Sequence, residues 1–237
     1  MQPFTNNYQK SMIPVHGTPL LEYIVEGLKY AGFQDFIFVV GYLKEQVINY
    51  FNKGTRFNIN IEYVEQTKLN GTGGALLLCE GLINDKHFFL TWGDVLVPYT
   101  IYKKVYDTYR KKQNDFILVS NYQENLEKGC AIYCEGNFCI KMVEKPPKNE
   151  IYNTNLNNCG IFIFSKEIFE ILKETNLSKR GELEIPDALS KGIQKYNWKV
   201  RVIKMKDGEF RGDFGDPEIY KKLNEKKSWL NDLKPSP

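Results

Sequence analysis

Two acidic residues, Asp94 and Asp213, stand in segments that suit the binding of a divalent cation. Asp94 follows an apolar run at 88–91 and Gly93, so it is expected just past the carboxyl end of a buried strand, where open α/β sheets bind ligands. A carboxylate at this place suits Mg²⁺, which takes few protein oxygens and keeps its phosphate ligands. A turn or helix-capping aspartate explains residue 94 equally well. Asp213 is a spare carboxylate in a glycine-rich loop whose Asp216 caps the next helix.

A second signal is the glycine-rich stretch at 66–75, which lies between a predicted strand and a predicted helix. Small residues let a ligand approach the backbone closely, and a helix start offers unpaired N–H groups to an anion or a base edge. A flexible surface turn has the same composition, and the segment alone does not separate the two interpretations. Its substrate-binding candidates are Gln66, Gly71 and Thr72.

A third signal is the pair Glu144 and Lys145 at the end of a predicted strand. Lysine can hold a phosphate as a point charge, and the neighbouring carboxylate can accept hydrogen bonds from sugar hydroxyls. A solvated ion pair is the commoner meaning of such a dipeptide.

Hydrophobic periodicity supplies the elements that must position these residues. Alternating strands and helices in the first half predict an α/β fold: a Rossmann-like three-layer α/β/α arrangement with a mostly parallel sheet and a small antiparallel part. We expect Thr18 to cap the first helix, Pro19 to begin it and Gly32 to end it. Further strands are expected at 36–40, 59–64, 88–91, 116–120, 159–164 and 199–203, a hairpin at 130–134 and 138–143, and helices at 43–51, 74–82, 101–112, 185–196 and 217–230.

Composition excludes several classes of protein. The 237 residues are 42% hydrophobic and 14% aromatic, which argues against a disordered chain. This length predicts one domain over 1–230 with a tail at 231–237. A net charge of +3 gives no reason to expect a nucleic-acid partner, and no apolar run is long enough to span a membrane. No signal peptide is recognisable, and five cysteines without metal or disulfide spacing predict a cytoplasmic protein. A homo-oligomer is left open.

The ordered segments resemble the sugar-1-phosphate nucleotidyltransferases, in particular the glucose-1-phosphate thymidylyltransferases. The resemblance runs from Met1 to about Asn224 and rests on eight matches in order, which is more specific than any single motif. They are MQPFT with QKSMIPV at 1–15, TPLLEY at 18–23, the spacing of Gln66 and Gly71, WGD at 92–94, EKP at 144–146, NCGIF at 158–162, RGELEIPD at 180–187, and DFGDPE at 213–218.

This resemblance implies a reaction and a set of roles. A sugar-1-phosphate attacks the α-phosphorus of a nucleoside triphosphate, giving pyrophosphate and an NDP-sugar. The resemblance implies that Asp94 and Asp213 hold Mg²⁺, that Lys10 neutralises the nucleotide phosphates and that Lys145 holds the sugar phosphate. It implies sugar contacts by Gly129, Glu144, Asn158 and Glu184, with Glu182 as a neighbouring alternative. The base would be read by Gln66 and Gly71, in the loop that also contains Thr72.

The sequence also departs from the family's pattern. The family's first strand and glycine-rich phosphate loop precede the segment at which this sequence starts, so we interpret Met1 as an internal methionine or a fragment edge. A chain truly without that loop is expected to bind nucleotides or sugar phosphates without efficient catalysis. Trp92 replaces the usual Asn before Gly93.

The resemblance favours glucose-1-phosphate with dTTP or UTP as the substrates, and three alternatives remain. The first alternative is guanylyl transfer to mannose- or heptose-1-phosphate. A non-catalytic regulatory homologue fits the departure at the start. A family-A glycosyltransferase is disfavoured, because Asp94-Val95-Leu96 lacks the expected Asp-x-Asp.

Overall fold

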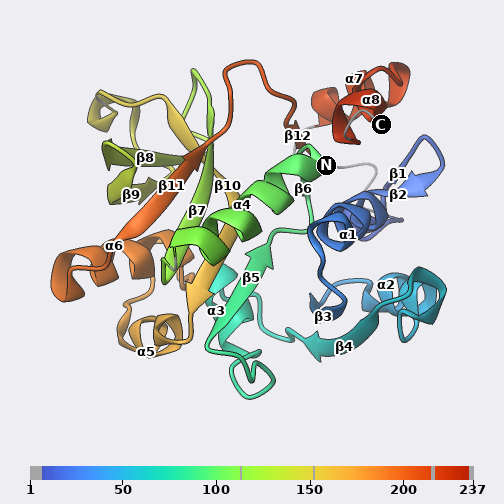
Figure 1. Ribbon diagram of the computed structural model, residues 1–237, viewed down its shortest axis with the longest axis horizontal. Helices are drawn as coiled ribbons and strands as arrows, with labels where there is room; N and C mark the ends of the chain where they lie inside the picture. Colours follow the sequence, from blue (N-terminus) through green and yellow to red (C-terminus); the bar gives the residue numbers. More distant parts are fainter. Residues whose placement is uncertain (1–6, 113, 152, 215–216, 235–237) are drawn as a thin grey trace. The chain divides into compact units, whose positions relative to one another are not determined.

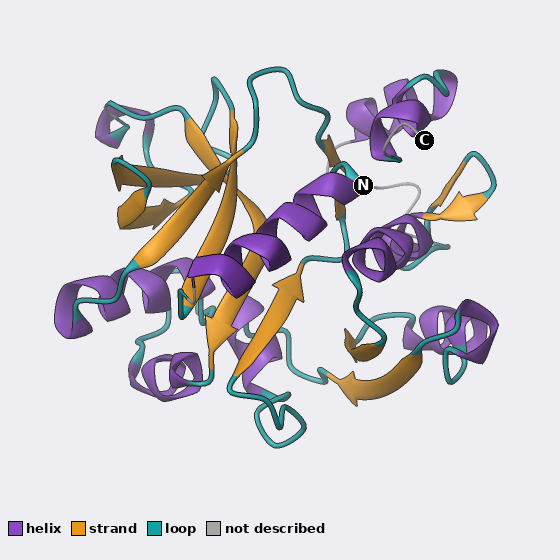
Figure 2. Cartoon of the chain, viewed as in Figure 1, coloured by secondary structure: helices purple, strands orange, loops and turns teal. Residues whose placement is uncertain are grey.

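The computed structural model describes residues 7–112, 114–151, 153–214 and 217–234. They form two compact units, each described by itself. The first unit holds the described residues up to Glu65 together with Trp92–Tyr106 and the part from Phe210 onward, and the second unit holds Gln66–Thr91 and Asp107–Glu209. Figure 1 labels the helices and strands of both units, and Figure 2 distinguishes them by type.

The first unit begins with a short hairpin that leads into an amphipathic helix. Leu20, Ile24 and Leu28 recur on the buried face of this helix, α1, and Gly32 ends it in the left-handed region at φ 103°, as predicted. The predicted start is wrong, because residues 18–19 pair with residues 14–15 as a strand and Leu20 is the first helical residue. The elements are η2 (Lys10–Met12), β1 (Pro14–Val15), β2 (Thr18–Pro19) and α1 (Leu20–Ala31).

An aromatic core holds the next part of this unit. Phe38 on β3 meets Phe51 on α2 edge to face, with ring centroids 5.4 Å apart, and Phe57 packs on Phe51 at 4.8 Å. These contacts seat the helix on the parallel pair β3–β4. The elements are β3 (Asp35–Val40), α2 (Lys44–Phe51), η3 (Thr55–Phe57) and β4 (Asn60–Glu65).

Two later segments complete the first unit. Strand β12 pairs with β6, and Tyr220 of α7 donates a hydrogen bond to the backbone oxygen of Pro14 at 3.1 Å. The helix predicted at 217–230 is two helices separated by a short break. The elements are β6 (Val95–Leu96), α4 (Tyr99–Lys112, which continues into the second unit), β12 (Gly212–Asp213), α7 (Pro217–Glu225) and α8 (Trp229–Leu233).

A six-stranded sheet in the order β5-β10-β7-β11-β9-β8 organises the second unit. All residues of β10 are buried, as are the first five of β7. Helix α6 packs on β9 and on α5 (Figure 1). The elements are α3 (Thr72–Leu77), β5 (His87–Thr91), β7 (Phe116–Tyr122), β8 (Cys130–Glu135), β9 (Phe138–Glu144), η4 (Lys148–Glu150), β10 (Leu156–Ser165), α5 (Glu167–Glu174), α6 (Ile185–Tyr196) and β11 (Val200–Lys204).

The sheet differs from the expected mostly parallel one. Among the described strands, β7–β11 and β3–β4 pair in parallel, whereas the other pairs are antiparallel. An apolar run shows that a strand is buried on both faces but carries no information about the direction of its partner. The α/β class holds, and the sheet is mixed.

No helix in the part of the chain that the structure describes combines the length and the apolar character needed to cross a lipid bilayer.

Candidate active site

Lys10 and Asp94 form an ion pair in the first unit, between Nζ and Oδ2. The turn that carries Lys10 is fixed by Gln9, whose side-chain oxygen accepts a hydrogen bond from the Ser11 N–H at 2.6 Å. The side chains of Lys10 and Asp94 remain 36% and 29% exposed, so both stay accessible to a ligand. The structure therefore brings together two of the residues predicted to act on the phosphates.

Asp213 lies beside Asp94 on the neighbouring strand. Residue 213 is in register with Val95 in the β6–β12 pair, and the Phe214 N–H donates to the backbone oxygen of Asp94 at 3.0 Å. Arg211 Nη2 donates to Asp213 Oδ2 at 3.0 Å, a contact that the sequence interpretation missed. The predicted helix-capping residue Asp216 lies outside the described residues.

This arrangement fits a magnesium ion shared with phosphate. The described residues contain no group of three or more His, Cys, Asp or Glu side chains placed to hold a metal by themselves. Mg²⁺ is usually bound by one or two carboxylates, with substrate phosphates and water completing its ligands. Asp213 on β12 and Asp94 in the turn directly before β6 supply two carboxylates from neighbouring backbone positions.

In the second unit, the predicted base-reading loop is joined to the segment that precedes α6. The Leu183 N–H donates to the Asn70 oxygen at 2.7 Å, and the Gly73 N–H donates to the Leu183 oxygen at 2.8 Å. Thr72 Oγ1 accepts from the Ile185 N–H at 3.3 Å. Gln66 Nε2 donates to Asn70 Oδ1 at 3.1 Å within the loop. The two loops therefore form one backbone-paired structure.

Gly71 is required at its position by two independent constraints. Its φ is +95°, and a Cβ there would lie 2.5 Å from the backbone oxygen of Leu183. We expect Gly71→Ala to lower the free energy of unfolding by about 1–3 kcal/mol, because strain and overpacking add. Urea denaturation measures this change. Gly81→Ala is the control, since a Cβ there meets nothing within 4 Å, and equal effects of the two substitutions would contradict the interpretation.

Glu144 and Lys145 lie at the base of the β8–β9 hairpin. Lys145 adopts a left-handed φ of 46°, and its N–H donates to the Gly129 oxygen at 2.8 Å. A Cβ on Gly129 would lie 2.2 Å from Asn157 Oδ1, so the glycine gives room to the Asn157 side chain. The structure thus brings Gly129, Glu144 and Lys145 together, and Asn157 is a neighbour that the sequence interpretation did not name.

Asn158 lies on β10 opposite Ser120 of β7. Its Oδ1 accepts from the Gly160 N–H at 2.9 Å. Its Nδ2 is buried and has no hydrogen-bond partner among the described residues. A buried donor without a partner carries a free-energy penalty, so this group is suited to meet a ligand oxygen.

Arg180 joins the predicted acidic residues of the second unit. Its Nη2 forms an ion pair with Glu184 Oε1 and lies 3.2 Å from Glu182 Oε2 and 3.8 Å from Glu144 Oε1. The sequence RGELE could have indicated this role in part, because an arginine near two glutamates suggests charge compensation. Burial raises the pKa of Glu184, which is 3% exposed, and the Arg180 hydrogen bond opposes that rise.

Glu144 has a pKa raised to about 7, mainly by burial and then by the nearby Glu184 charge. The charges of Arg180 and Lys145 lower the pKa again but do not cancel the rise. Its protonation state therefore changes near neutral pH, unlike that of an exposed glutamate.

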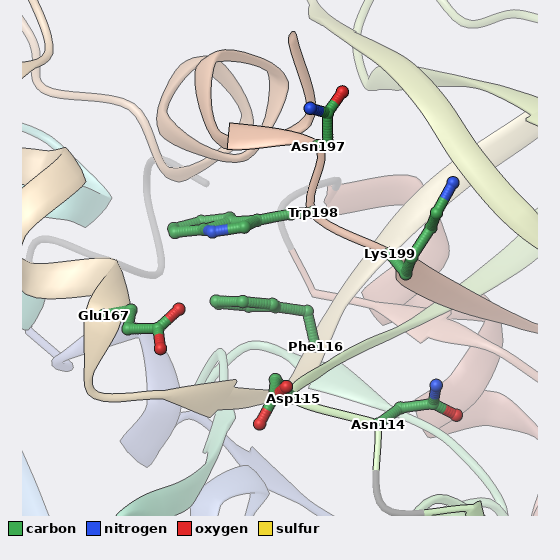
Figure 3. Close-up of a pocket in the computed structure, with 7 residues that line it drawn as sticks. All are labelled: Asn114, Asp115, Phe116, Glu167, Asn197, Trp198 and Lys199. Atoms are coloured by element: carbon green, nitrogen blue, oxygen red, sulfur yellow. The ribbon is translucent and has the colours of Figure 1, made fainter. Parts of the chain in front are cut away.

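A cavity of about 260 Å³ elsewhere in the second unit contains none of the predicted residues (Figure 3). Its Trp198 and Phe116 rings stack on each other with centroids 4.0 Å apart. The cavity lies at the starts of β7 and β11, whereas ligands of open α/β sheets bind at the carboxyl ends of strands. It is therefore separate from the candidate residues of the second unit.

A family model for nucleotidyl transferases matches residues 1–228. The chain belongs to this family. It is 34% identical over 217 residues to the bifunctional protein GlmU of Methanococcus maripaludis, and this match covers 92% of this chain and 49% of the relative. It is 27% identical over 191 residues to a glucose-1-phosphate thymidylyltransferase of Streptomyces griseus, covering 80% of this chain and 52% of the relative.

Solved structures of nucleotidyl transferases share the fold. A crystal structure of UDP-glucose pyrophosphorylase complexed with UDP-glucose superposes with a TM-score of 0.84 and 28% identity, covering 95% of this chain and 92% of that one. The chain spans about half the length of the GlmU relatives that it matches. The resemblance drawn from the eight sequence segments is confirmed at the level of the family and the fold.

Proposed function

We propose that this chain transfers a nucleotidyl group from a nucleoside triphosphate to a sugar-1-phosphate, with glucose-1-phosphate and dTTP or UTP as its substrates. The observation that carries the proposal is the backbone pairing that brings Asp213 next to the turn of Asp94, together with the ion pair between Lys10 and Asp94. The family membership supports the same reaction. The thymidylyltransferase relative and the UDP-glucose complex support these bases and this sugar.

The reaction requires positioning and charge neutralisation. A sugar-phosphate oxygen forms the new bond to the α-phosphorus, and the bond from that phosphorus to the bridging oxygen breaks as pyrophosphate leaves. The nucleophile is already anionic at neutral pH, so no strong general base is needed. Lys10 would bind the nucleotide phosphates, and Lys145 would bind the sugar phosphate. Such preorganised charges act on the negative charge of the transition state.

The remaining residues would bind and orient the substrates. Glu144 and Glu184 would accept hydrogen bonds from sugar hydroxyls, while the buried Asn158 Nδ2 would donate one. Gln66 and Gly71 would meet the base in the loop that is fixed against Leu183.

Magnesium is the cofactor that we propose. Asp94 and Asp213 would hold it, and it would neutralise charge on the α-phosphate when bound. The carboxylate oxygens at these two positions are the ligand type that this ion prefers.

We also propose a cytoplasmic enzyme without a nucleic-acid or membrane partner. All five cysteines are thiols, which supports a reducing compartment. The small net charge of +3 supports small anionic substrates rather than a polyanion.

Pyrophosphate release tests the reaction. We expect release with Mg²⁺ when glucose-1-phosphate and dTTP or UTP are both present, and about 10-fold or more slower release with mannose-1-phosphate and GTP, because specificity follows the sugar and base contacts. A preference for mannose-1-phosphate and GTP would replace the substrate assignment with guanylyl transfer. Substrate binding by calorimetry without release from any pair would favour the non-catalytic homologue.

A further inference from the structure

Cys130 and Glu144 face each other at the base of the β8–β9 hairpin. They are directly opposite in the antiparallel register, so their side chains lie on the same face of the sheet. Residues paired in this way have Cβ atoms about 4.5–5.5 Å apart, close enough for their side chains to touch. Cys130 is 2% exposed, whereas the Glu144 side chain is partly accessible. The buried thiol and the partly accessible carboxyl are therefore neighbours on one face of the hairpin.

The thiol in this place is a hydrogen-bond donor. Burial raises the pKa of Cys130 well above its usual value, so the group keeps its proton at neutral pH. A hydrogen bond from this thiol to Glu144 would stabilise the carboxylate and lower the pKa of that group. The hydrogen bond that the structure shows for the sulfur goes to the backbone oxygen of Ala131 at 4.0 Å, and at this length it competes only weakly for the donor.

Glu144 has few other groups to hold its charge. Arg180 is the nearest cation, but its Nη2 pairs with Glu184 and lies closer to Glu182 than to Glu144. The titratable and charged groups around the Cys130–Glu144 pair are Cys139 and Lys145 on or next to β9, Arg180, Glu182 and Glu184 in the segment before α6, and Asp187 on α6.

We propose that Cys130 is a positioning residue for sugar binding: its S–H holds the Glu144 carboxylate ionised and oriented, so that the free oxygen accepts hydrogen bonds from sugar hydroxyls. The inference rests on the proposed function, because it assigns Glu144 to the sugar. Cys130 itself does not touch the substrate.

The sign of the effect follows from the chemistry of the carboxyl group. Ionised Glu144 is an acceptor for two or more hydroxyls, whereas protonated Glu144 loses part of that capacity. Affinity for the sugar-1-phosphate should fall as pH drops through the pKa of Glu144. A variant without the thiol donor has a higher Glu144 pKa, so its loss of affinity begins at a higher pH.

Two substitutions at Cys130 distinguish a role as hydrogen-bond donor from a role in apolar packing alone. Cys130→Val keeps an apolar side chain of similar size and removes the donor, whereas Cys130→Ser keeps a donor and removes the apolar sulfur. A merely structural cysteine would tolerate valine better than serine. A positioning cysteine would show the reverse order in the pH profile.

The first experiment measures KM for glucose-1-phosphate and kcat between pH 5.5 and 8.5 by pyrophosphate release. For Cys130→Val we expect the midpoint of the KM profile to rise by about half to one pH unit, with KM near pH 6.5 increased about 3- to 10-fold and kcat changed less than about 2-fold. Cys130→Ser should keep the midpoint at or below that of the unchanged chain. The substrate's own phosphate ionisation is common to all variants, so the differences report on the protein.

The second experiment does not depend on turnover. The side-chain carboxyl carbons are labelled with ¹³C and titrated by NMR, and Glu144→Gln identifies the signal of residue 144. A higher midpoint in Cys130→Val than in Cys130→Ser supports the inference. Superimposable titrations of the unchanged, Val and Ser chains would overturn it, even if turnover is intact and the proposed function stands.

The two hypotheses therefore fail in different ways. If the unchanged chain releases no pyrophosphate with any substrate pair, the proposed function fails and the sugar role of Cys130 fails with it. If release is normal but the KM profiles of the Val and Ser variants coincide, only the role of Cys130 is overturned.

Discussion

Asp94→Ala is expected to lower kcat for pyrophosphate release by on the order of 10²–10³-fold, which is the effect of removing a group that acts on transition-state charge. The carboxylate is the proposed metal ligand and the partner of Lys10. The fold should survive, because the Asp94 contact that joins β6 to β12 is made by its backbone oxygen. Steady-state kinetics measure the loss, and thermal unfolding checks the fold.

The metal requirement makes this test specific. Asp94→Asn keeps the side-chain size but loses the charge, so we expect a higher Mg²⁺ concentration for half-maximal rate. Asp232→Asn is the matched control, because Asp232 is an exposed acidic residue of the same unit. Wild-type-like turnover in Asp94→Ala would remove the proposed role of this residue.

The sequence predicts most of the helices and strands because their periodicity is strong. Helix α6 was expected at 185–196 and has those bounds, since Pro186 marks its first turn and its apolar residues repeat at helical spacing. The hairpin of β8 and β9 was also predicted, because residues 135–137 offer a turn between two apolar runs.

Features set by tertiary pairing were not predictable from local patterns. Residues 18–19 have the composition of a helix start, but pairing with residues 14–15 places them in a strand. Helix α5 is a different case, because its apolar residues Ile168 and Leu172 repeat at helical spacing and the local pattern could have indicated it. The sequence pattern also did not indicate strand direction in the six-stranded sheet, because buried parallel and antiparallel strands have similar apolar runs.

The candidate site likewise depends on pairing and packing that local sequence patterns do not indicate. Asp94 and Asp213 are 119 positions apart (213 minus 94), and the strands that bring them together, β6 and β12, have two residues each. Strands this short have no periodicity to detect, so their pairing could be reached only through the resemblance to a family. The roles of Arg180 beside the glutamates and of Cys130 opposite Glu144 depend on packing and register, which no spacing along the chain expresses.

Lys10→Ala is expected to reduce kcat by a similar factor of about 10²–10³, but through a different contribution. Lys10 contacts Asp94 and is 36% exposed, so its ammonium group can exchange the carboxylate for nucleotide phosphates. Its loss removes a cation that competes for Asp94, so the Mg²⁺ concentration for half-maximal rate should stay the same or fall, in contrast to Asp94→Asn.

Two further variants complete the Lys10 test. Lys10→Arg keeps the charge and should recover part of the rate, although its planar group is a different phosphate ligand. Lys53→Ala removes an exposed lysine of the same unit and should change neither kcat nor the metal requirement. An unchanged kcat in Lys10→Ala would remove the proposed role of Lys10. A higher Mg²⁺ requirement like that of Asp94→Asn would show that Lys10 acts on the carboxylate rather than on the phosphates.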